Sequence, residues 1–190
     1  MTQPIAIHPE TTASPRTLRW VVSHLTLPFA GPVASAPGLD DLGLTDARVA
    51  EQGGEPGTAV VERVEATADA VLVTLAPGRD WRSEGPVVRT ALTTALGRLD
   101  EWVPGARAHE LGPDDALRMC ATELIEGPVG QIATAHGGSI ELVEAHDGVV
   151  SVRMHGACKG CPAAVITMHQ RLENQLRRRV PDLREVVEVR

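Results

Sequence analysis

The dipeptide Asp147-Gly148 constrains the fold more tightly than any other short feature of this chain, because it lies between two stretches typical of β-strands. Ile140–Glu144 precedes it and Val149–Met154 follows it, and both are rich in aliphatic and β-branched residues. Asp-Gly favours a two-residue turn whose backbone twist matches that of paired antiparallel strands. We therefore predict a β-hairpin, whose second strand carries on one face the apolar side chains of Val150, Val152 and Met154.

Helical patterns flank this hairpin on both sides. Before it, Pro113-Asp114 favours the start of a helix, and Gly127-Pro128 should interrupt or kink that helix. After it, apolar residues recur at helical spacing over Val165–Val180, and a strand-like run follows at Val186–Val189. The order helix, hairpin, cysteine loop, helix, strand predicts a compact α+β domain over residues 114–190.

The helix after the hairpin ends in three consecutive arginines. Arg177, Arg178 and Arg179 fall in its last turn, where positive side chains oppose the negative end of the helix dipole. We interpret this triplet as a stabiliser of the helix end rather than as a binding site for an anionic partner.

The first hundred residues carry weaker patterns, which predict a second α+β unit. Leu18–Val22 is typical of a short strand, and Val60–Val64 with Ala70–Leu75 is typical of an antiparallel pair. Apolar residues then recur at helical spacing over Glu84–Leu99, which predicts one helix.

Two irregular stretches set the predicted domain boundaries. The Gly- and Pro-rich residues 31–57 should contain only short structure, such as a helical turn near Thr45–Glu51. Residues 103–113, VPGARAHELGP, are polar and have no clear period, which is typical of a linker. We therefore predict two small α+β domains, residues 1–102 and 114–190, joined by a linker at 103–113.

Composition argues against several classes of partner. The formal net charge is −7 and aromatic residues make up only 2% of the chain, so we expect neither a basic surface nor stacking platforms for nucleic acid. The first twenty residues lack the pattern of a signal peptide, and no stretch approaches the ~18 uncharged apolar residues of a membrane span. Three cysteines are too few for a secreted disulfide framework, so we expect a cytoplasmic location without nucleic-acid or membrane partners.

The reactive side chains concentrate in GACKGCPAA, residues 156–164, which joins the predicted hairpin to the helix after it. Cys158 and Cys161 stand in C-x-x-C spacing, and Pro162 suits the first position of a helix. The backbone N–H groups and the dipole at a helix N-terminus favour the thiolate, which binds metals and attacks electrophiles. The pair supplies half of the ligands of a four-coordinate thiolate site. The third cysteine, Cys120, is expected to be a small buried residue of the first helix.

Three interpretations of this half-site follow from the residues. A redox dithiol is expected between parallel strands linked by a helix and beside an aromatic residue, whereas this motif follows a hairpin and residues 111–190 contain no aromatic residue. A zinc site within one chain would recruit two of His136, His155 and His169, which form no second closely spaced ligand pair. A symmetric dimer would bring two copies of Cys158 and Cys161 together, and the four thiolates would hold a [4Fe–4S] cluster or one zinc ion.

The C-terminal sequence as a whole resembles a known family. Residues 136–189, HGGSIELVEAHDGVVSVRMHGACKGCPAAVITMHQRLENQLRRRVPDLREVVEV, resemble the NifU-like C-terminal domain of the Nfu family. They share its Gly-Gly pair, its hairpin ending in G-x-C-x-x-C-P and its late Val-Pro before the last strand. The first hundred residues are similar, more weakly, to the Nfu N-terminal domain through ETTASPRTLRW and DWRSEGPVVRTAL.

This resemblance implies an iron–sulfur cluster carrier without enzymatic turnover. It implies that Cys158 and Cys161 of two subunits hold a [4Fe–4S] cluster between them, so that the protein is a homodimer when loaded. The cluster would come from an upstream scaffold and pass to apo iron–sulfur client proteins, with the N-terminal domain recognising clients or donors. A C-x-x-C dithiol oxidoreductase and a zinc-bridged structural dimer are the alternative functions.

Overall fold

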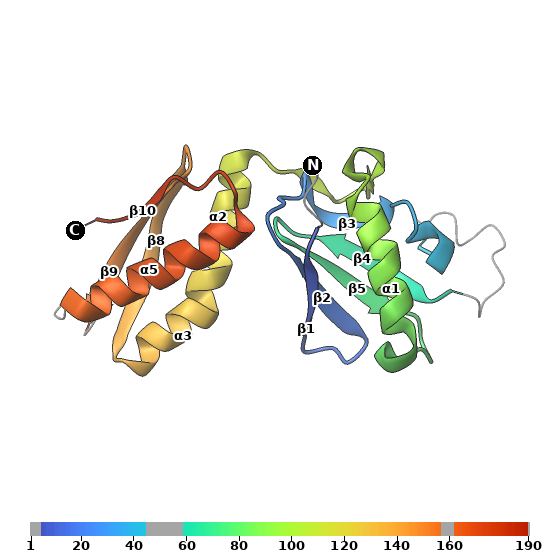
Figure 1. Cartoon of the computed structure of the whole chain (residues 1–190), viewed down its shortest axis with the longest axis horizontal. Coiled ribbons are helices and arrows are strands. Elements are labelled where there is room, and N and C mark those ends of the chain that lie inside the picture. The colour runs from blue at the N-terminus through green and yellow to red at the C-terminus, as the bar shows by residue number, and fades with distance from the viewer. Residues whose placement is uncertain (1–4, 45–58, 157–161, 190) are drawn as a thin grey trace. The chain divides into compact units, whose positions relative to one another are not determined.

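The computed structural model describes residues 5–44, 59–156 and 162–189, and the chain divides into two compact units (Figure 1). The first contains residues 1–23 and 27–110, and the second contains residues 24–26 and 111–190. Each unit combines helices with a β-sheet, so the predicted α+β class is confirmed. Within the described ranges, no helix is both long enough and apolar enough to cross a bilayer.

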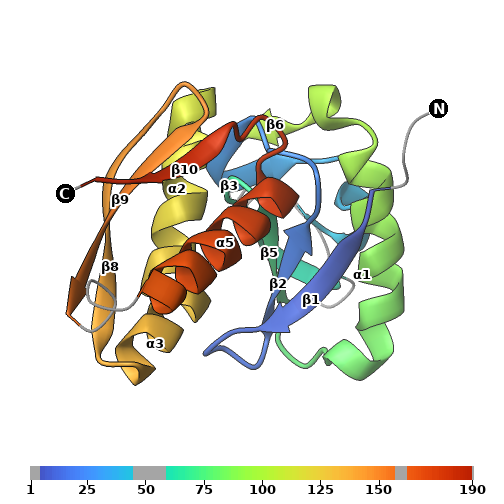
Figure 2. The same ribbon diagram turned by 60° about the vertical axis from the view of Figure 1, so that its left-hand side comes forward.

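The first unit is built on a seven-stranded sheet in the order β1-β2-β5-β4-β3-β6, with β7 also paired with β3. All of these pairs are antiparallel. The helix α1 lies along one face of the sheet (Figures 1 and 2). The elements are β1 (Ile7–Thr11), β2 (Thr17–Val22), β3 (Phe29–Ser35), the 3₁₀ turn η1 (Asp40–Leu42), β4 (Val61–Ala66), β5 (Ala70–Leu75), α1 (Trp81–Leu96), the 3₁₀ turn η3 (Leu99–Glu101), β6 (Val103–Pro104) and β7 (His109–Glu110).

The predicted strand pair and helix of the first unit are present. β4 and β5 pair antiparallel, with Val64 opposite Val73, and both side chains are buried. The helix α1 begins three residues before the predicted start because the Asp80 carboxylate accepts backbone N–H bonds from Arg82 at 2.9 Å and Ser83 at 3.1 Å. This side-chain cap satisfies donors that have no partner within the helix.

Two stretches of the first unit differ from the prediction. The Gly-Pro pair at 31–32 lies inside the regular strand β3, because Gly31 adopts φ +117° where the backbone of Ala108 approaches closely. A Cβ at Gly31 would lie 2.8 Å from the Ala108 Cα, so only glycine fits there. The segment 103–113, expected as a linker, contains β6 and β7, and both pair with β3. The helical turn expected near Thr45–Glu51 lies outside the described residues.

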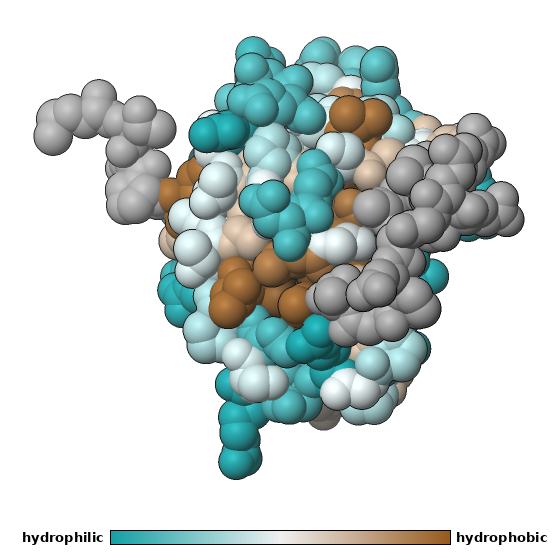
Figure 3. Space-filling view, turned by 90° about the vertical axis from the view of Figure 1, so that its right-hand side faces the viewer, coloured by the Kyte–Doolittle hydropathy of each residue, from teal (hydrophilic) through white to brown (hydrophobic). Residues whose placement is uncertain are grey.

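The core of the first unit is mainly aliphatic, but its surface also carries apolar side chains. Val87 and Val103 are each about half exposed. On the face of the molecule that Figure 3 shows, apolar side chains gather near the centre and are surrounded by polar ones. The first unit therefore offers some apolar surface in addition to its buried core.

The described part of the second unit packs three helices against one face of a three-stranded sheet (Figures 1 and 2). The strand order is β10-β9-β8; β8 and β9 are antiparallel, whereas β9 and β10 are parallel. The buried residues are again mostly aliphatic. The elements are α2 (Pro113–Glu126), α3 (Pro128–Ala135), β8 (Gly138–His146), β9 (Val149–Gly156), α5 (Pro162–Arg179) and β10 (Glu185–Glu188).

The predicted break between the first two helices of this unit is confirmed at Gly127, which ends α2 and precedes α3. Gly127 has φ −103° and ψ −123°, which is not helical, and Pro128 then takes the first position of α3. A Cβ at Gly130 would lie 1.8 Å from the Ile125 carbonyl oxygen, so the two helices meet too closely for any side chain there.

The predicted hairpin is confirmed with its turn at Asp147-Gly148, where φ is +50° and +76°. Two successive positive φ angles are the conformation that Asp-Gly accommodates best in a two-residue turn. Val150, Val152 and Met154 are all buried, as the alternation in the second strand predicts. A β-bulge interrupts the register between Leu142 and Glu144 on β8.

Candidate functional site

The two cysteines of the C-x-x-C motif lie outside the described residues, so the site is defined by the elements on either side of them. The strand β9 ends at Gly156 and the helix α5 begins at Pro162. The helix is 18 residues long, and its N-terminus directly follows Cys161 in the sequence. An N-terminus of this kind favours a thiolate through its unpaired N–H groups and its dipole.

Immediately before the cysteine segment, the backbone of Gly156 lies in close contact with that of Gly137 and Gly138. Gly156 pairs with Gly138 across the hairpin and adopts φ +66°, a conformation that favours glycine. A Cβ at Gly156 would lie 2.6 Å from the carbonyl oxygen of Gly137, so a side chain would collide with the backbone. The Gly-Gly pair at 137–138 and Gly156, the glycine before the motif, therefore meet in the same close backbone contact.

His155, a candidate zinc ligand, takes part in a network of charged side chains on the surface, next to the contact between Gly156 and Gly137. The Glu141 carboxylate lies 3.0 Å from His155 Nε2 and accepts a hydrogen bond from Arg153 Nη1 at 3.1 Å. These contacts, first that with His155 and then that with Arg153, lower the pKa of Glu141 below its usual value. The His155 ring nitrogen thus already has a partner within the sheet.

Histidine 169 is also engaged in holding the fold together. Its Nε2 atom forms a short hydrogen bond with the carbonyl oxygen of Val186, and its Nδ1 atom lies 3.8 Å from Glu173. Because Val186 lies in β10, this contact fastens α5 to the last strand. His136, the third candidate, is the exposed residue that ends α3.

Two of the three arginines at the end of α5 contact neighbouring elements, and their effect on the helix dipole stays a prediction. Arg177 donates to the carbonyl oxygens of Leu183 at 3.1 Å and Arg184 at 2.8 Å, which lie on the way to β10. Arg179 forms an ion pair with Glu123 of α2 at 3.5 Å. Arg177 and Arg179 therefore connect the end of α5 to two neighbouring elements.

Cys120 is 1% exposed within α2, as expected for a small residue of the core. It lies on a different element from the C-x-x-C motif. A thiol at this depth is shielded from solvent reagents.

The strand that leads into the C-x-x-C motif has a parallel neighbour, which the sequence did not predict. The motif follows the antiparallel strand pair β8–β9, as predicted, but β9 also pairs with β10 in parallel, with α5 between them. The cysteine segment therefore lies between a strand and the helix that leads to a parallel strand. Parallel pairing joins residues distant in the chain, so the local pattern gave no sign of it. An aromatic neighbour, the other expected mark of a redox dithiol, is absent from the sequence of residues 111–190.

A cluster of three ionisable groups, which the sequence did not indicate, lies at the turn of the hairpin. His146 Nδ1 is 2.6 Å from the Asp114 carboxylate, His146 Nε2 is 3.3 Å from Asp147, and Asp114 also accepts the backbone N–H of Asp147 at 2.9 Å. The hydrogen bond between His146 and Asp114 raises the pKa of His146 and lowers that of Asp114. These contacts attach the turn to the N-terminus of α2.

Comparison with known proteins finds a match between this unit and the model of a known domain family. Residues 122–187 match the family model of the NifU-like domain, and this range includes Cys158 and Cys161. The chain is 26% identical over 146 residues to the mitochondrial NFU1 iron-sulfur cluster scaffold homolog of Drosophila ananassae, covering 72% of this chain and 51% of that protein. It is 31% identical over 97 residues to the Fe/S biogenesis protein NfuA of Acinetobacter baylyi, covering 48% and 46% of the two chains. The chain spans about half the length of the curated relatives that it matches.

Proposed function

Because the chain carries a NifU-like domain and is related to the Nfu iron–sulfur cluster proteins, we propose that it is a carrier of iron–sulfur clusters. It binds a [4Fe–4S] cluster between two copies of the chain and delivers it to apo-proteins. The observation that carries this proposal is the match of residues 122–187 to that domain, with the C-x-x-C motif inside it. The cluster is cargo that the protein passes on, so we assign it no enzymatic turnover.

Cys158 and Cys161 are the proposed ligands, and each subunit contributes both. Four cysteine thiolates are the usual ligand set of a [4Fe–4S] cluster, and one chain offers only two in this motif. Three features support these two residues: the helix N-terminus that favours thiolates, the burial of Cys120, and the structural partners of His155 and His169. A zinc ion on the same four thiolates is the competing occupant.

Delivery requires that the ligands be exchanged. A thiolate of the acceptor replaces a carrier thiolate on iron, so that one Fe–S bond forms as another breaks and the cluster's oxidation state is unchanged. Ligands on two separable chains suit this exchange, because partial opening of the dimer frees coordination positions.

We further propose a division of labour between domains 1–102 and 114–190. The C-terminal domain binds the cluster, and the N-terminal domain recognises clients or an upstream scaffold that donates the cluster. The apolar side chains on the surface of the first unit are compatible with such a role. The expected cytoplasmic location stays a prediction.

Anaerobic reconstitution with iron and sulfide tests the proposal. The wild-type protein should bind about four iron and four sulfide ions per dimer and absorb broadly near ~400 nm. Cys158→Ser and Cys161→Ser should each abolish this absorption, whereas the matched change Cys120→Ala should retain it. Loss of the cluster in Cys120→Ala with the fold intact would contradict the ligand assignment.

The alternative functions give different results in the same preparation. Stoichiometric zinc in freshly purified protein, with no uptake of iron, would indicate the zinc-bridged dimer. A colourless protein that reduces disulfides at catalytic rates would indicate a dithiol oxidoreductase, which the parallel arrangement of β9 and β10 makes worth measuring.

A further inference from the structure

A continuous groove runs along the strand β8, where this strand faces α2 and α3. It consists of two adjoining hollows of about 450 Å³ and 280 Å³, and both are lined by Ile125, Glu126 and Ile140. The larger one extends along β8 to Ala145, and the smaller one begins at Ser139. Seven consecutive residues of one strand therefore border the groove, a length of ~23 Å at the usual rise of a β-strand.

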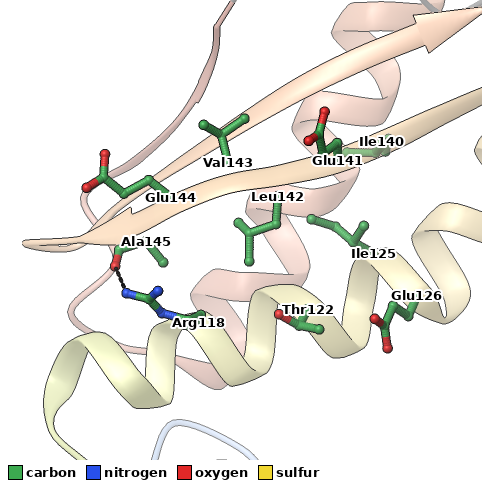
Figure 4. Close-up of a pocket in the computed structure, with 10 residues that line it drawn as sticks. All are labelled: Arg118, Thr122, Ile125, Glu126, Ile140, Glu141, Leu142, Val143, Glu144 and Ala145. Atoms are coloured by element: carbon green, nitrogen blue, oxygen red, sulfur yellow. Dashed lines mark hydrogen bonds between the residues drawn. The ribbon is translucent and has the colours of Figure 1, made fainter.

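The strand beside this groove is an edge of its sheet. Among the described strands, β8 pairs only with β9. An edge strand presents backbone N–H and C=O groups that another extended chain can pair with. Arg118 of α2 donates to the carbonyl oxygen of Ala145 at 3.3 Å, which covers one such group at the far end of the groove (Figure 4).

The lining of the groove combines apolar side chains with three acidic ones, Glu126, Glu141 and Glu144, and one basic one, Arg118. Figure 4 shows Leu142 of β8 and Ile125 of α2 projecting into the space between strand and helix. Glu141, Val143 and Glu144 point from β8 away from α2 (Figure 4), and Val143 is 44% exposed. Glu126 and Glu144 form no ion pair with any described residue, whereas Glu141 is held by Arg153 and His155.

We propose that this groove binds an extended, basic segment of a protein partner as an additional β-strand. The segment pairs with the open edge of β8 and places apolar side chains over Leu142 and Ile125. Its Lys or Arg side chains lie on the opposite face of the added strand, on the side of Glu144, and the carboxylate of Glu126 on α2 adds to the negative charge of the groove. Strand addition supplies main-chain hydrogen bonds, and the side chains along the groove supply the selectivity. Naming the partner as a client rests on the proposed function, whereas the binding itself does not.

The charges favour such a partner over a second copy of this chain. Pairing two β8 edges would bring Glu126 and Glu144 of each copy near those of the other, and like charges oppose association. The bulge between Leu142 and Glu144 also breaks the regular edge that symmetric pairing would need. A basic peptide relieves both problems, because it neutralises the acidic groups and needs to pair only with short stretches of the edge.

The groove also leads towards the proposed cluster ligands. Its smaller hollow ends at Ser139, which is paired with His155, and the next pair is Gly138 with Gly156. Gly156 is the last residue before the segment that contains Cys158. A strand bound along β8 therefore has one end close to the start of the cysteine segment, where an acceptor would need to be.

A pair of synthetic peptides tests this proposal on the full-length, cluster-free protein. The first alternates valine with lysine over ten residues and is blocked at both ends, and the second has glutamate in place of every lysine. We expect the lysine peptide to bind, measured by fluorescence anisotropy, and to slow hydrogen exchange at the amides of β8. Binding of both peptides alike, or protection at β10 or in the first unit in place of β8, would overturn the proposal.

Charge reversal in the groove provides the matched variants. Glu126→Lys combined with Glu144→Lys should weaken the lysine peptide about tenfold, which corresponds to ~1.4 kcal/mol. The control Glu185→Lys reverses an exposed glutamate on β10, the opposite edge of the same sheet, and should leave binding unchanged. Equal weakening by both variants would show a general charge effect and overturn the assignment of the groove.

Reconstitution of the same variants separates this proposal from the carrier function. If the doubly reversed variant takes up its cluster normally but does not bind the peptide, both proposals stand. If the wild-type protein forms a cluster but does not bind the peptide, the groove proposal fails and the carrier function remains. If it binds the peptide but forms no cluster, the carrier function fails and the groove remains. Self-association of the cluster-free protein that protects the β8 amides would identify a second copy as the occupant and overturn the choice of partner.

Discussion

Gly156 is the residue at which the sheet meets the cysteine segment, and its backbone leaves no room for a side chain. We expect Gly156→Ala to destabilise the second unit by about 1–3 kcal/mol, because the substitution combines a positive φ with a Cβ 2.6 Å from the Gly137 carbonyl oxygen. Urea unfolding followed by circular dichroism measures this loss. The control Gly78→Ala has a similar φ of +83° but meets no atom within 4 Å. Equal destabilisation by the two changes would show that the contact with Gly137 is unimportant.

The contact between His146 and Asp114 makes the stability of the second unit depend on pH. The pKa of His146 is raised above its usual value of 6.5, so its contribution is present below pH 6.5 and is lost as the pH rises through the raised value. The pKa of Asp114 is lowered from 3.8, so its contribution is present above that pH and is lost as the pH falls through the lowered value. We therefore expect the pair to stabilise the hairpin turn most between about pH 4 and pH 6.5.

A His146→Gln variant tests this pH dependence. Hydrogen exchange at the turn should increase in the wild-type protein between pH 6 and pH 8, after correction for intrinsic rates, and the variant should show little such change. The control His136→Gln alters an exposed histidine of the same unit and should behave like the wild type. An unchanged pH profile in His146→Gln would mean that the pair does not hold the turn.

At the scale of elements, the contacts of Arg177 fasten α5 to the chain that continues into β10. Arg177→Ala removes its bonds to the Leu183 and Arg184 carbonyl oxygens and its contact with Glu173. We expect a loss of about 1 kcal/mol, because the side chain is partly exposed and its ion pair contributes little. Chemical denaturation with Arg178→Ala as control measures it, since Arg178 is exposed and makes no described side-chain contact. The same loss in both variants would refute the anchoring role.

Elements that depend on local signals could be predicted from the sequence. The hairpin at Asp147-Gly148 and the break at Gly127-Pro128 are specified by residues adjacent in the chain, and both are present. The strand β3 was missed because Gly31 and Pro32 usually interrupt strands. Gly31 is instead needed where the Ala108 backbone approaches, a contact between residues far apart in the sequence.

The candidate site was predictable only in part, because some of its contacts join residues that lie far apart in the sequence. The proposed ligands, Cys158 and Cys161, were chosen from their C-x-x-C spacing, which is a local pattern. The parallel pairing of β9 with β10 and the contact of Asp114 with His146 depend on tertiary packing, and no short pattern encodes them. The groove along β8 likewise exists only once α2 and α3 have packed against the sheet.

At the scale of the whole molecule, the chain combines two units that differ in what they offer chemically. The second carries the C-x-x-C motif, the match to the NifU-like domain and the acidic groove. The first is an α+β unit with apolar side chains on its surface. If the second unit alone binds the cluster, residues 111–190 expressed without the first unit should still take up iron and sulfide after reconstitution, once circular dichroism has shown that the fragment folds. A folded fragment that takes up no iron would assign part of the cluster site to the first unit.

Native mass spectrometry of the anaerobically reconstituted protein distinguishes a cluster shared by two copies of this chain from a cluster held by one copy. We expect a dimer that carries one [4Fe–4S] cluster and loses it in Cys158→Ser and Cys161→Ser. A monomer that retains a complete cluster, or a dimer whose added mass is that of zinc alone, would contradict it.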